Sequence, residues 1–561
     1  MGDVDGELPP LTWRSWLVLV LFVVATFFVI RPAAFSLPLP GRRQTGRRLW
    51  VNVDMKLAPW VAILLLLAST AITFRREVVR GFVGGDGIEP YAVVILIFAL
   101  AYICISLDES GLLSYVALLV TRRWGGNGRA LLLCFYVLSA AMALLTNNDV
   151  AVLCLTPIVC VFSDATGAPA EPFLMAMFVA ANTASMALVI GNPTNIIVAQ
   201  ANGVSFLSYT AWMGLPFLGA AAAGAAVLYA TSLRAVPRAI AVDMDLRPRD
   251  MVKRVWQAAL GASVLVACLV ALSVSSLFGV TVWVVTLPFG GAMLAADIAI
   301  DLWHTRAAAL PPSTASPPTY ADDGGACDKA SANGSKPHVE SAENRLDSAP
   351  RPTPCGDCGD CATAELPGNG AAALTKVPAR PVRRWLERWR QTAMLRLPTV
   401  VAVVGRLPYG IIPFSLGMFV IVEALTGQGW TPRLAWALRR MCPSATAAVF
   451  AVGAVSTAAC NVLNNLPMTI LFARAFRHAE FAQVDAATRR GAMFALIIGS
   501  NLGANLTLVG SLAGLMFQDI ARQKGRRIGY FAFVRWCAPA MAVQLAVSCA
   551  ILAAELAIKK Q

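Results

Sequence analysis

Charged side chains are scarce in this chain, at 14% of its 561 residues, against the roughly 25% that is typical of soluble domains. Apolar residues take their place: 57% of the chain is hydrophobic, and the mean hydropathy is +0.64. This composition excludes an ordinary soluble protein. It predicts an all-α, multi-pass integral membrane protein whose spanning helices each need about 20 apolar residues.

The sequence also lacks a basic stripe interleaved with aromatic residues, although its net charge is +14. The basic residues lie mostly in short loops beside apolar runs, which is the distribution expected near anionic lipid. We therefore expect the lipid bilayer as a partner, and no nucleic acid.

Two further features are absent: a disulfide framework and a signal-peptide cleavage site. Nine of the 13 cysteines lie in or beside apolar runs, where a thiol behaves as a small hydrophobic group. The first apolar run follows an acidic N-terminus and no small-residue cleavage site follows it, so we interpret it as a transmembrane helix.

Apolar runs predict about 10–12 spans in two halves. The first half is residues 1–303, with a repeat core at about 90–232, and the second is 391–561, with a core at about 407–556. The runs are Trp16–Phe35, Leu57–Phe74, Pro90–Leu107, Ala130–Leu145, Val150–Phe162, Phe173–Ile190, Leu207–Ser232, Val255–Phe278, Val280–Ile300, Leu407–Glu423, the arms around Asn464, Ala492–Ile498, Leu506–Phe517 and Phe531–Ile558.

Residues 304–390 differ in composition from both halves. They are rich in Pro, Ser, Ala and Gly, with charges of both signs, which is typical of a disordered linker. The arginine-rich end of this linker places it in the cytoplasm. The acids Asp108, Glu109 and Glu423 stand at the ends of apolar runs, and we interpret them as interfacial anchors.

The polar cluster Asn147-Asn148-Asp149 lies in the middle of an apolar stretch. A carboxylate and two carboxamides at that depth are costly unless they face protein or water, where they usually mark an ion or solute site. The flanking arms form either one long kinked span or a re-entrant hairpin. The alternatives are a capped turn between two buried helices, with Asp149 as a cap.

A second interruption is Gly191-Asn192-Pro193-Thr194-Asn195, where Gly and Pro break a helix. Two half-helices with free backbone ends would result, and such ends bind ions: anions at N-termini, cations at C-termini. The alternative is that the helix leaves the membrane at Gly191.

The second half repeats these features in order. Pro408-Tyr409 follows Pro90-Tyr91 by 318 residues, and Asn464-Asn465 follows Asn147-Asn148 by 317. For the interruption, Ile498-Gly499 is matched to Ile190-Gly191 at an offset of 308, and Asn505 to Asn195 at 310. Paired interrupted helices in two halves are typical of secondary transporters, usually with inverted halves. Hydropathy alone does not fix the inversion.

The repeat predicts one central solute site. It would be built from the two hairpin tips and the two broken helices, with Asn, Thr and Ser side chains suited to a small polyhydroxylic acid or oxyanion. The candidate residues are Asn147, Asn148, Asp149, Asn192, Thr194, Asn195, Asn464, Asn465, Ser500, Asn501, Asn505 and Thr507.

No ATP-binding motif of the form GxxxxGK[ST] occurs in the chain. We therefore expect a transporter without a cofactor, not an enzyme, driven by an ion gradient or by a separate ATPase subunit. Whether two copies form a homodimer stays open. A third group of candidates lies in the linker: Cys355, Cys358 and Cys361 can wrap a soft thiophilic centre such as As(III), Sb(III) or Zn²⁺, or they are incidental.

With these motifs in place, the chain resembles the arsenite/antimonite efflux permeases (ArsB type) of the ion transporter superfamily. The similarity covers nearly the whole chain except the linker. The resemblance implies hairpins at both Asn pairs, broken helices at both Gly-Asn motifs, and proton-coupled export of arsenite or antimonite by antiport, which confers arsenical resistance. The stretches that carry it are LDESGLLSYVALLVTRRWGGNGR, NDVAVLCLTPIV, NPTNI, LGMFVIVEAL, NNLPMTIL and GSNLGANLTLVGSLAGL.

Two positions depart from the permease pattern. Val150 follows the first Asp where a Gly is usual, and Asn501 stands in the second broken helix where a carboxylate is usual. The sequence also resembles sodium/proton antiporters and the melanosomal P protein, so a sodium-coupled or small-anion transporter is the alternative. Asp149 is then the one carboxylate of the four central motifs, and a carboxylate partly withdrawn from water can exchange a proton near neutral pH.

Overall fold

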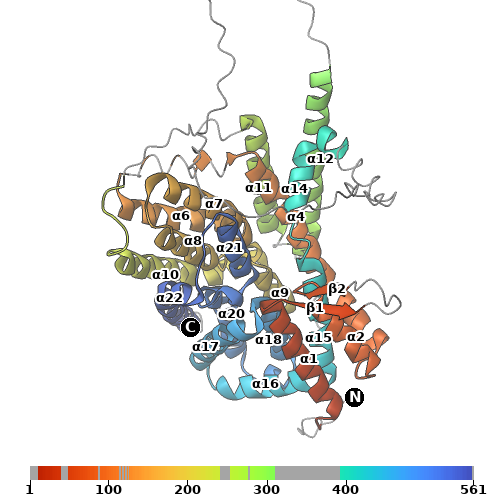
Figure 1. Cartoon of the computed structure of the whole chain (residues 1–561). Coiled ribbons are helices and arrows are strands. Elements are labelled where there is room, and N and C mark those ends of the chain that lie inside the picture. Colours follow the sequence, from red (N-terminus) through yellow and green to blue (C-terminus); the bar gives the residue numbers. More distant parts are fainter. Residues whose placement is uncertain are drawn as a thin grey trace, which may run out of the picture. The chain divides into compact units, whose positions relative to one another are not determined.

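A computed structural model gives the fold of this chain (Figure 1). It describes residues 10–38, 48–85, 89–240 without 113, 114, 117, 118, 120–122, 124 and 125, 253–309 without 276, 277 and 279, and 392–558. The predicted linker and its cysteines, from residue 310 to 391, lie outside the described residues. Internal contacts divide the chain into one unit of Met1–Thr305 with Ala393–Gln561 and another of Arg306–Thr392.

The predicted all-α membrane fold is confirmed. In the described part of the chain, eight helices are long and apolar enough to cross a membrane. The shorter apolar helices are Trp13–Val29 and Ala58–Ala68. The eight are Pro90–Glu109, Gly128–Leu145, Phe206–Ser232, Val255–Leu272, Trp283–Arg306, Pro398–Gly427, Ala445–Leu463 and Tyr530–Ile558.

The predictions for the N-terminal region were partly wrong. Helix α1 (Trp13–Ile30) ends before Phe35, and a strand, β1 (Ala33–Pro38), pairs antiparallel with β2 (Arg48–Val53). Pro32 provides the reason for the early end, since proline disfavours the helical conformation of the residue before it. Helix α2 (Ala58–Ala68) is also shorter than predicted, and it ends before Thr70, which has a φ of 55°.

The two halves follow the same order of elements, in agreement with the predicted repeat. Each has a long helix, a helical hairpin, a helix, a short 3-10 turn, a short helix and a final long helix. In the first half these are α4 (Pro90–Glu109), α6 (Gly128–Leu145), α7 (Asn148–Thr166), α8 (Ala170–Ala184), η2 (Val189–Gly191), α9 (Pro193–Ala201) and α10 (Phe206–Ser232). In the second they are α15 (Ile411–Gly427), α17 (Ala445–Leu463), α18 (Asn465–Arg477), α20 (Ala486–Leu502), η6 (Leu508–Gly510), α21 (Leu512–Gln523) and α22 (Tyr530–Ile558), with an additional 3-10 turn, η5 (Gly503–Asn505), between α20 and η6.

Other helices surround these repeats. The longest two, α11 and α12, follow the first repeat, and α14 precedes the second. They are α3 (Val79–Val83), α11 (Val255–Ser275), α12 (Val282–Ala309), α14 (Pro398–Arg406), α16 (Trp430–Met441) and α19 (Ala479–Ala482). Several helices begin with proline at their first or second position, where the missing N–H is not needed.

Both helix breaks exist, but the sequence placed them incorrectly. Helix α8 ends at Ala184, before the predicted Ile190, and α20 continues through Gly499 to Leu502. A Cβ at Gly499 would lie 1.9 Å from Ser456 Oγ. This glycine therefore permits close packing between helices α20 and α17, and it does not break the helix.

The structure also corrects the register of the repeat. The turn η2 corresponds to η6, so Gly191 matches Gly510 at an offset of 319. Both glycines pack closely on the chain at the start of the break: their Cβ positions lie 2.9 Å from Ser185 Cα and 3.3 Å from Ala504 Cα. A nearly constant offset of 317–319 therefore replaces the predicted shift of about nine residues between hairpin and break.

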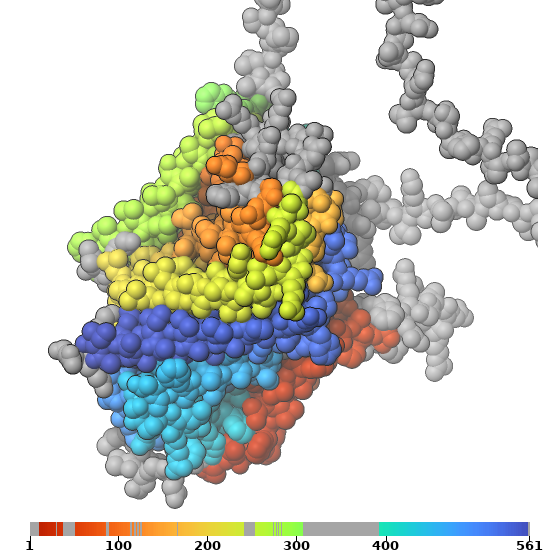
Figure 2. Space-filling view, turned by 90° about the vertical axis from the view of Figure 1, so that its left-hand side faces the viewer, coloured from red at the N-terminus to blue at the C-terminus, as the bar shows by residue number. Residues whose placement is uncertain are grey.

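The two halves exchange contacts at their short helices. Helix α9 of the first half packs on α18 of the second, and α21 of the second packs on α7 of the first. Helices α10 and α22 pack along each other, with α17 on the other side of α22 (Figure 2). Each half therefore completes the surroundings of the other's hairpin.

A buried ion pair connects α18 with α15. The guanidinium of Arg474 and the carboxylate of Glu423 form this pair, and their side chains are 2% and 7% exposed. Arg80, half exposed, contributes a second contact to Glu423 at 3.5 Å. The interpretation of Glu423 as an interfacial anchor was therefore wrong, because it lies inside the helix packing.

We predict that Glu423→Gln lowers the free energy of unfolding in detergent by about 3–5 kcal/mol, because the Arg474 charge stays buried without its counter-charge. The matched control is Glu480→Gln, which removes an exposed pair with Arg439 at 3.4 Å and should cost no more than about 1 kcal/mol. Equal losses in the two variants would contradict a stabilising role for the buried pair.

Candidate functional site

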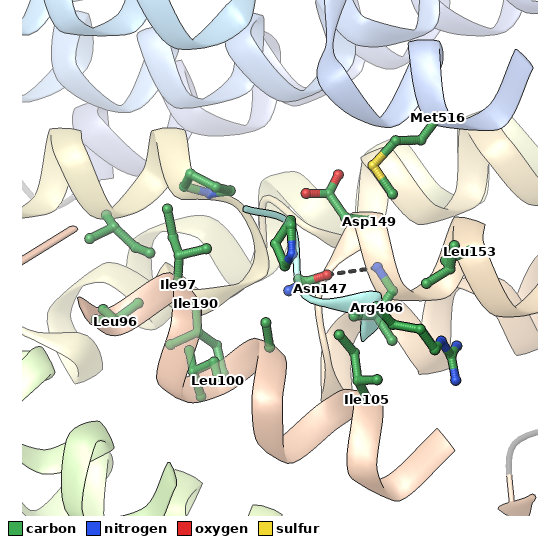
Figure 3. A pocket seen from close by; sticks show the side chains of 15 residues that line it. Leu96, Ile97, Leu100, Ile105, Asn147, Asp149, Leu153, Ile190, Arg406 and Met516 are labelled. Atoms are coloured by element: carbon green, nitrogen blue, oxygen red, sulfur yellow. Dashed lines mark hydrogen bonds between the residues drawn. The ribbon is translucent and has the colours of Figure 1, made fainter. Parts of the chain in front are cut away.

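The two hairpin turns are capped by asparagine. Asn147 accepts a hydrogen bond from Val150 N at 2.8 Å and caps α7 (Figure 3). Asn464 caps α18 through Leu466 N at 3.4 Å, and its amide nitrogen donates to Val509 O at 3.0 Å. Asn464 has a φ of 67°, a conformation that asparagine tolerates better than most residues.

Asn501 joins the two broken helices. Its Oδ1 accepts from Ser185 Oγ at 2.8 Å and from Asn192 Nδ2 at 3.0 Å. Its Nδ2 donates to Asn195 Oδ1 at 2.7 Å and to Ile497 O at 2.8 Å. The side-chain amide of Asn501 thus uses all four of its hydrogen-bonding positions. It holds the first helix break in place against α20.

A second chain of amides connects the first hairpin with both breaks. Asn148 Nδ2 donates to Asn182 Oδ1 at 3.0 Å, and Asn182 Nδ2 donates to Asn505 Oδ1 at 3.1 Å. Asn148 Oδ1 and Asn505 Nδ2 are buried and make no hydrogen bond within the described part of the chain. Since unpaired buried polar atoms are costly, these two atoms are candidates for contact with a solute or water.

A small cavity of about 20 Å³ lies between these motifs. Its walls come from the first turns of five helices, so backbone N–H groups and the positive ends of helix dipoles surround it. The lining residues are Asn148 and Asp149 of α7, Asn192, Pro193 and Thr194 at α9, Ile411 of α15, Asn465 and Leu466 of α18, and Ser511, Leu512 and Ala513 at α21.

A second cavity, of about 40 Å³, adjoins the first hairpin (Figure 3). Its wall is mostly apolar, with Leu100, Ile105 and Met516 among the side chains. Arg406 lines one side, and its guanidinium pairs with Asp108 at 2.5 Å and Glu109 at 3.3 Å. The cavity is therefore mostly apolar, and its one cationic lining group, Arg406, is already paired with two acids.

Asp149 and Pro193 are the residues that line both cavities. Asp149 lies in the first turn of α7, where a carboxylate is favoured by the helix dipole. Asn147, not Asp149, caps the helix, so the side chain of Asp149 is left to face the cavities. The only acid in the four motifs thus lies at the boundary between the two cavities.

The candidate residues divide into two groups. Those that line a cavity are Asn147, Asn148, Asp149, Asn192, Thr194 and Asn465. Those that hold the hairpins and breaks together and line neither of these two cavities are Asn195, Asn464, Ser500, Asn501, Asn505 and Thr507.

Sequence reasoning missed three polar residues of this network. Asn182 and Ser185 were assigned to an uninterrupted apolar helix, and Asn461, which accepts from Thr507 Oγ1 at 2.5 Å, was not singled out. The corrected offset of 319 would have found Asn182, because it places this residue opposite Asn501. The described residues contain no group of three or more His, Cys, Asp or Glu side chains that could hold a metal.

Family models match the two halves separately. The model described as a citrate transporter matches residues 49–309, and the model described as an arsenical pump membrane protein matches residues 393–548. The two matches lie on either side of the linker, and each contains one hairpin and one broken helix.

Whole-chain similarity is to membrane transporters of bacteria. An arsenical pump membrane protein of Yersinia enterocolitica is 25% identical over 441 residues, which cover 78% of this chain and 80% of the relative. One of Escherichia coli is 25% identical over 444 residues, 77% and 80% of the two chains. An uncharacterized transporter of Synechocystis is 20% identical over 519 residues, 90% and 93%.

Among solved structures, the chain of Neisseria gonorrhoeae MtrF, described as one of a class of antimetabolite efflux pumps, matches over 98% of this chain and 96% of its own. With 13% identity and a TM-score of 0.40, it adds nothing to the assignment. The family models and the arsenical pump relatives agree with the hairpins and broken helices described above. The chain is therefore a secondary transporter of the ion transporter superfamily, with similarity to the ArsB-type arsenical pump membrane proteins over most of its length.

Proposed function

We propose that this transporter exports arsenite or antimonite in exchange for protons, and that Asp149 carries the coupling proton. One observation carries the proposal: Asp149 is the single carboxylate that lines a cavity walled by the first turns of five helices, with the side-chain amides of Asn148, Asn192 and Asn465 among its lining groups. Such walls offer many hydrogen-bond donors and one acceptor that can be switched off by a proton.

The donors suit the substrate. Arsenite near neutral pH is mostly a neutral trihydroxide, with three oxygens that accept hydrogen bonds and three hydroxyl groups that donate them. Backbone N–H groups and the amide of Asn465 would donate to the oxygens, and Asn148 Oδ1 would accept from a hydroxyl. An ionised Asp149 would accept from a hydroxyl, which a protonated Asp149 does less well.

This arrangement makes substrate and proton alternatives at one carboxylate. The neutral trihydroxide binds best when Asp149 is ionised, and a proton on Asp149 weakens that binding. By linkage, the solute in turn weakens proton binding. Exchange follows from this alternation. Once the solute has left, Asp149 binds a proton, and the protonated site becomes accessible again from the side on which solute is loaded.

The cavity of about 20 Å³ has room for roughly one water molecule, which is less than a trihydroxide needs. Loading therefore requires the hairpin tips and broken helices to separate. The exchanged packing of α9 on α18 and α21 on α7 provides the surfaces for such a movement. Rocking of one repeat against the other around a fixed site is the usual mode of such transporters.

A small carboxylate anion is the second candidate substrate, and the five helix N-termini around the cavity favour it. The match of the first half to the citrate transporter model points the same way. An anion would bind best when Asp149 is protonated, so proton and anion would move together. The direction of flux relative to the proton gradient therefore separates the two candidates.

The test is flux in vesicles reconstituted with the purified chain. We predict that an inwardly directed proton gradient drives arsenite out of the vesicles, and that citrate and sodium do not compete. Proton-driven movement of citrate in the same direction as the protons would instead support the carboxylate candidate. Sodium-dependent proton movement without arsenite flux would support a sodium/proton antiporter.

We predict that Asp149→Asn reduces proton-driven arsenite flux by roughly 5–150-fold, the range of a coupling free energy of about 1–3 kcal/mol. Arsenite exchange across vesicles without a pH gradient should decrease less, because the amide still accepts hydrogen bonds. The matched control is Asp164→Asn on the same helix, an exposed acid paired with Arg526, which should leave both fluxes unchanged. Equal proton-driven flux in the Asp149 variant and the wild type would remove Asp149 from the mechanism.

A further inference from the structure

A second buried acid lies outside the central site. Asp297, on α12, is 0% exposed, although α12 is one of the candidate membrane spans. Tyr102 Oη donates to its Oδ2 at 3.1 Å and Ser106 Oγ donates to the same oxygen at 2.7 Å. A carboxyl group in a membrane helix is costly and usually functional, and nothing in the central site accounts for this one.

Close packing holds α12 against α4 beside this acid. A Cβ at Gly290 would lie 3.0 Å from Ala99 Cα, so a larger residue there would push the two helices apart. Two helical turns after Gly290, Asp297 faces Tyr102 and Ser106 of α4. The buried amide of Gln257, on α11, lies beside the same carboxyl. A seam of polar side chains therefore runs between three helices.

The charge of Asp297 has no counter-charge in the described part of the chain. No ion pair includes it, and its Oδ1 is buried without a hydrogen-bond partner there. The basic groups at this end of the helices are engaged elsewhere: Arg406 with Asp108 and Glu109, and Lys253 with Glu109. A buried carboxylate without a cation is so unfavourable that the group takes up a proton instead.

The remaining titratable groups on the facing helices are mostly acids, phenols and thiols. On α4 they are Tyr91, Tyr102, Cys104, Asp108 and Glu109, on α11 Cys268, and on α12 Asp301, His304 and Arg306. Arg254, Arg306 and Arg396 stand at the helix ends. The ionisable side chain nearest to Asp297 along its own helix is another acid, Asp301, and the cationic side chains stand two or more turns away.

Asp301 lies one turn closer to the end of α12. It is 2% exposed, and its Oδ2 accepts from Val400 N at 3.1 Å, in the first turn of α14. One turn further, Thr305 Oγ1 donates to Asp301 O at 2.8 Å. Asp297, Asp301 and Thr305 thus follow one face of the helix at spacings of four residues. These three polar side chains form a line along α12 from the buried acid to the end of the helix.

We propose that Asp297 is a second proton-binding site of this protein, separate from the central cavity, and that Asp301 serves it from the end of α12. Oδ1 carries the proton, since Oδ2 already accepts two hydrogen bonds. The amide of Gln257, which has both a donor and an acceptor, faces the protonated group. The site binds its proton whatever solute the central cavity takes, so it does not depend on the function proposed above.

Infrared difference spectroscopy on the full-length protein in lipid nanodiscs tests this proposal without any solute. The carbonyl stretch of a protonated carboxylic acid is separate from the bands of a carboxylate. We predict one such band at neutral pH that is absent in Asp297→Asn, that remains in Asp149→Asn, and that disappears as the pH is raised. A spectrum in which Asp297→Asn removes no band, or removes one that persists at every alkaline pH, would overturn the proposal.

Milder variants keep the test decisive if Asp297→Asn does not fold. Tyr102→Phe and Ser106→Ala each remove one donor to Oδ2, so each should shift the frequency of the band without removing it. Asp301→Asn should slow the exchange of the Asp297 proton for deuterium after transfer to heavy water, seen as a slower shift of the band. The reason is that the line of polar side chains from Asp297 to the helix end is interrupted. The matched control is Asp164→Asn, which should change neither. An unshifted band in both donor variants would show that it does not belong to Asp297.

Discussion

The hydrogen-bonding demand of interrupted backbone governs this fold. Every hairpin turn and helix break exposes N–H and C=O groups that lipid cannot satisfy. Asparagine side chains answer that demand in both halves: Asn195 binds Ser185 O and Leu188 O, Asn461 binds Gly503 O, and Asn464 binds Val509 O. The polar side chains at the centre are therefore needed first to satisfy the backbone groups at the breaks. Binding of a solute is a second use of the same polar region.

That condition explains why so few of the polar residues are free to contact a solute. Asn501 has every valence occupied by the two broken helices. A carboxylate at this position would have no donor to give to Asn195 Oδ1 unless it were protonated. The neutral amide of Asn501 therefore suits this hydrogen-bond network. Asp149 neither caps a helix nor takes part in the network, so its carboxyl group is free to change its charge.

The sequence predicted the membrane fold, the two hairpins and the existence of both breaks, because each is encoded by a local contrast between polar and apolar residues. It misplaced the breaks because Gly499 looks like a helix breaker and is in fact a packing contact with Ser456. It also missed the strand pair at Ala33–Pro38 and the burial of Glu423, since both depend on partners far away in the chain. Asp297 stood in an apolar run without a motif, and only packing against α4 gives it meaning.

The exchanged packing of the short helices has a consequence for biosynthesis. When the first half leaves the ribosome, α7 and α9 have no α21 and α18 to pack against. The amide of Asn182 then lacks Asn505, and that of Asn192 lacks Asn501. The first hairpin can therefore reach its final position only after the last third of the chain has been inserted, and a chain truncated before α20 would present its unpaired amides to the quality-control proteases of the membrane.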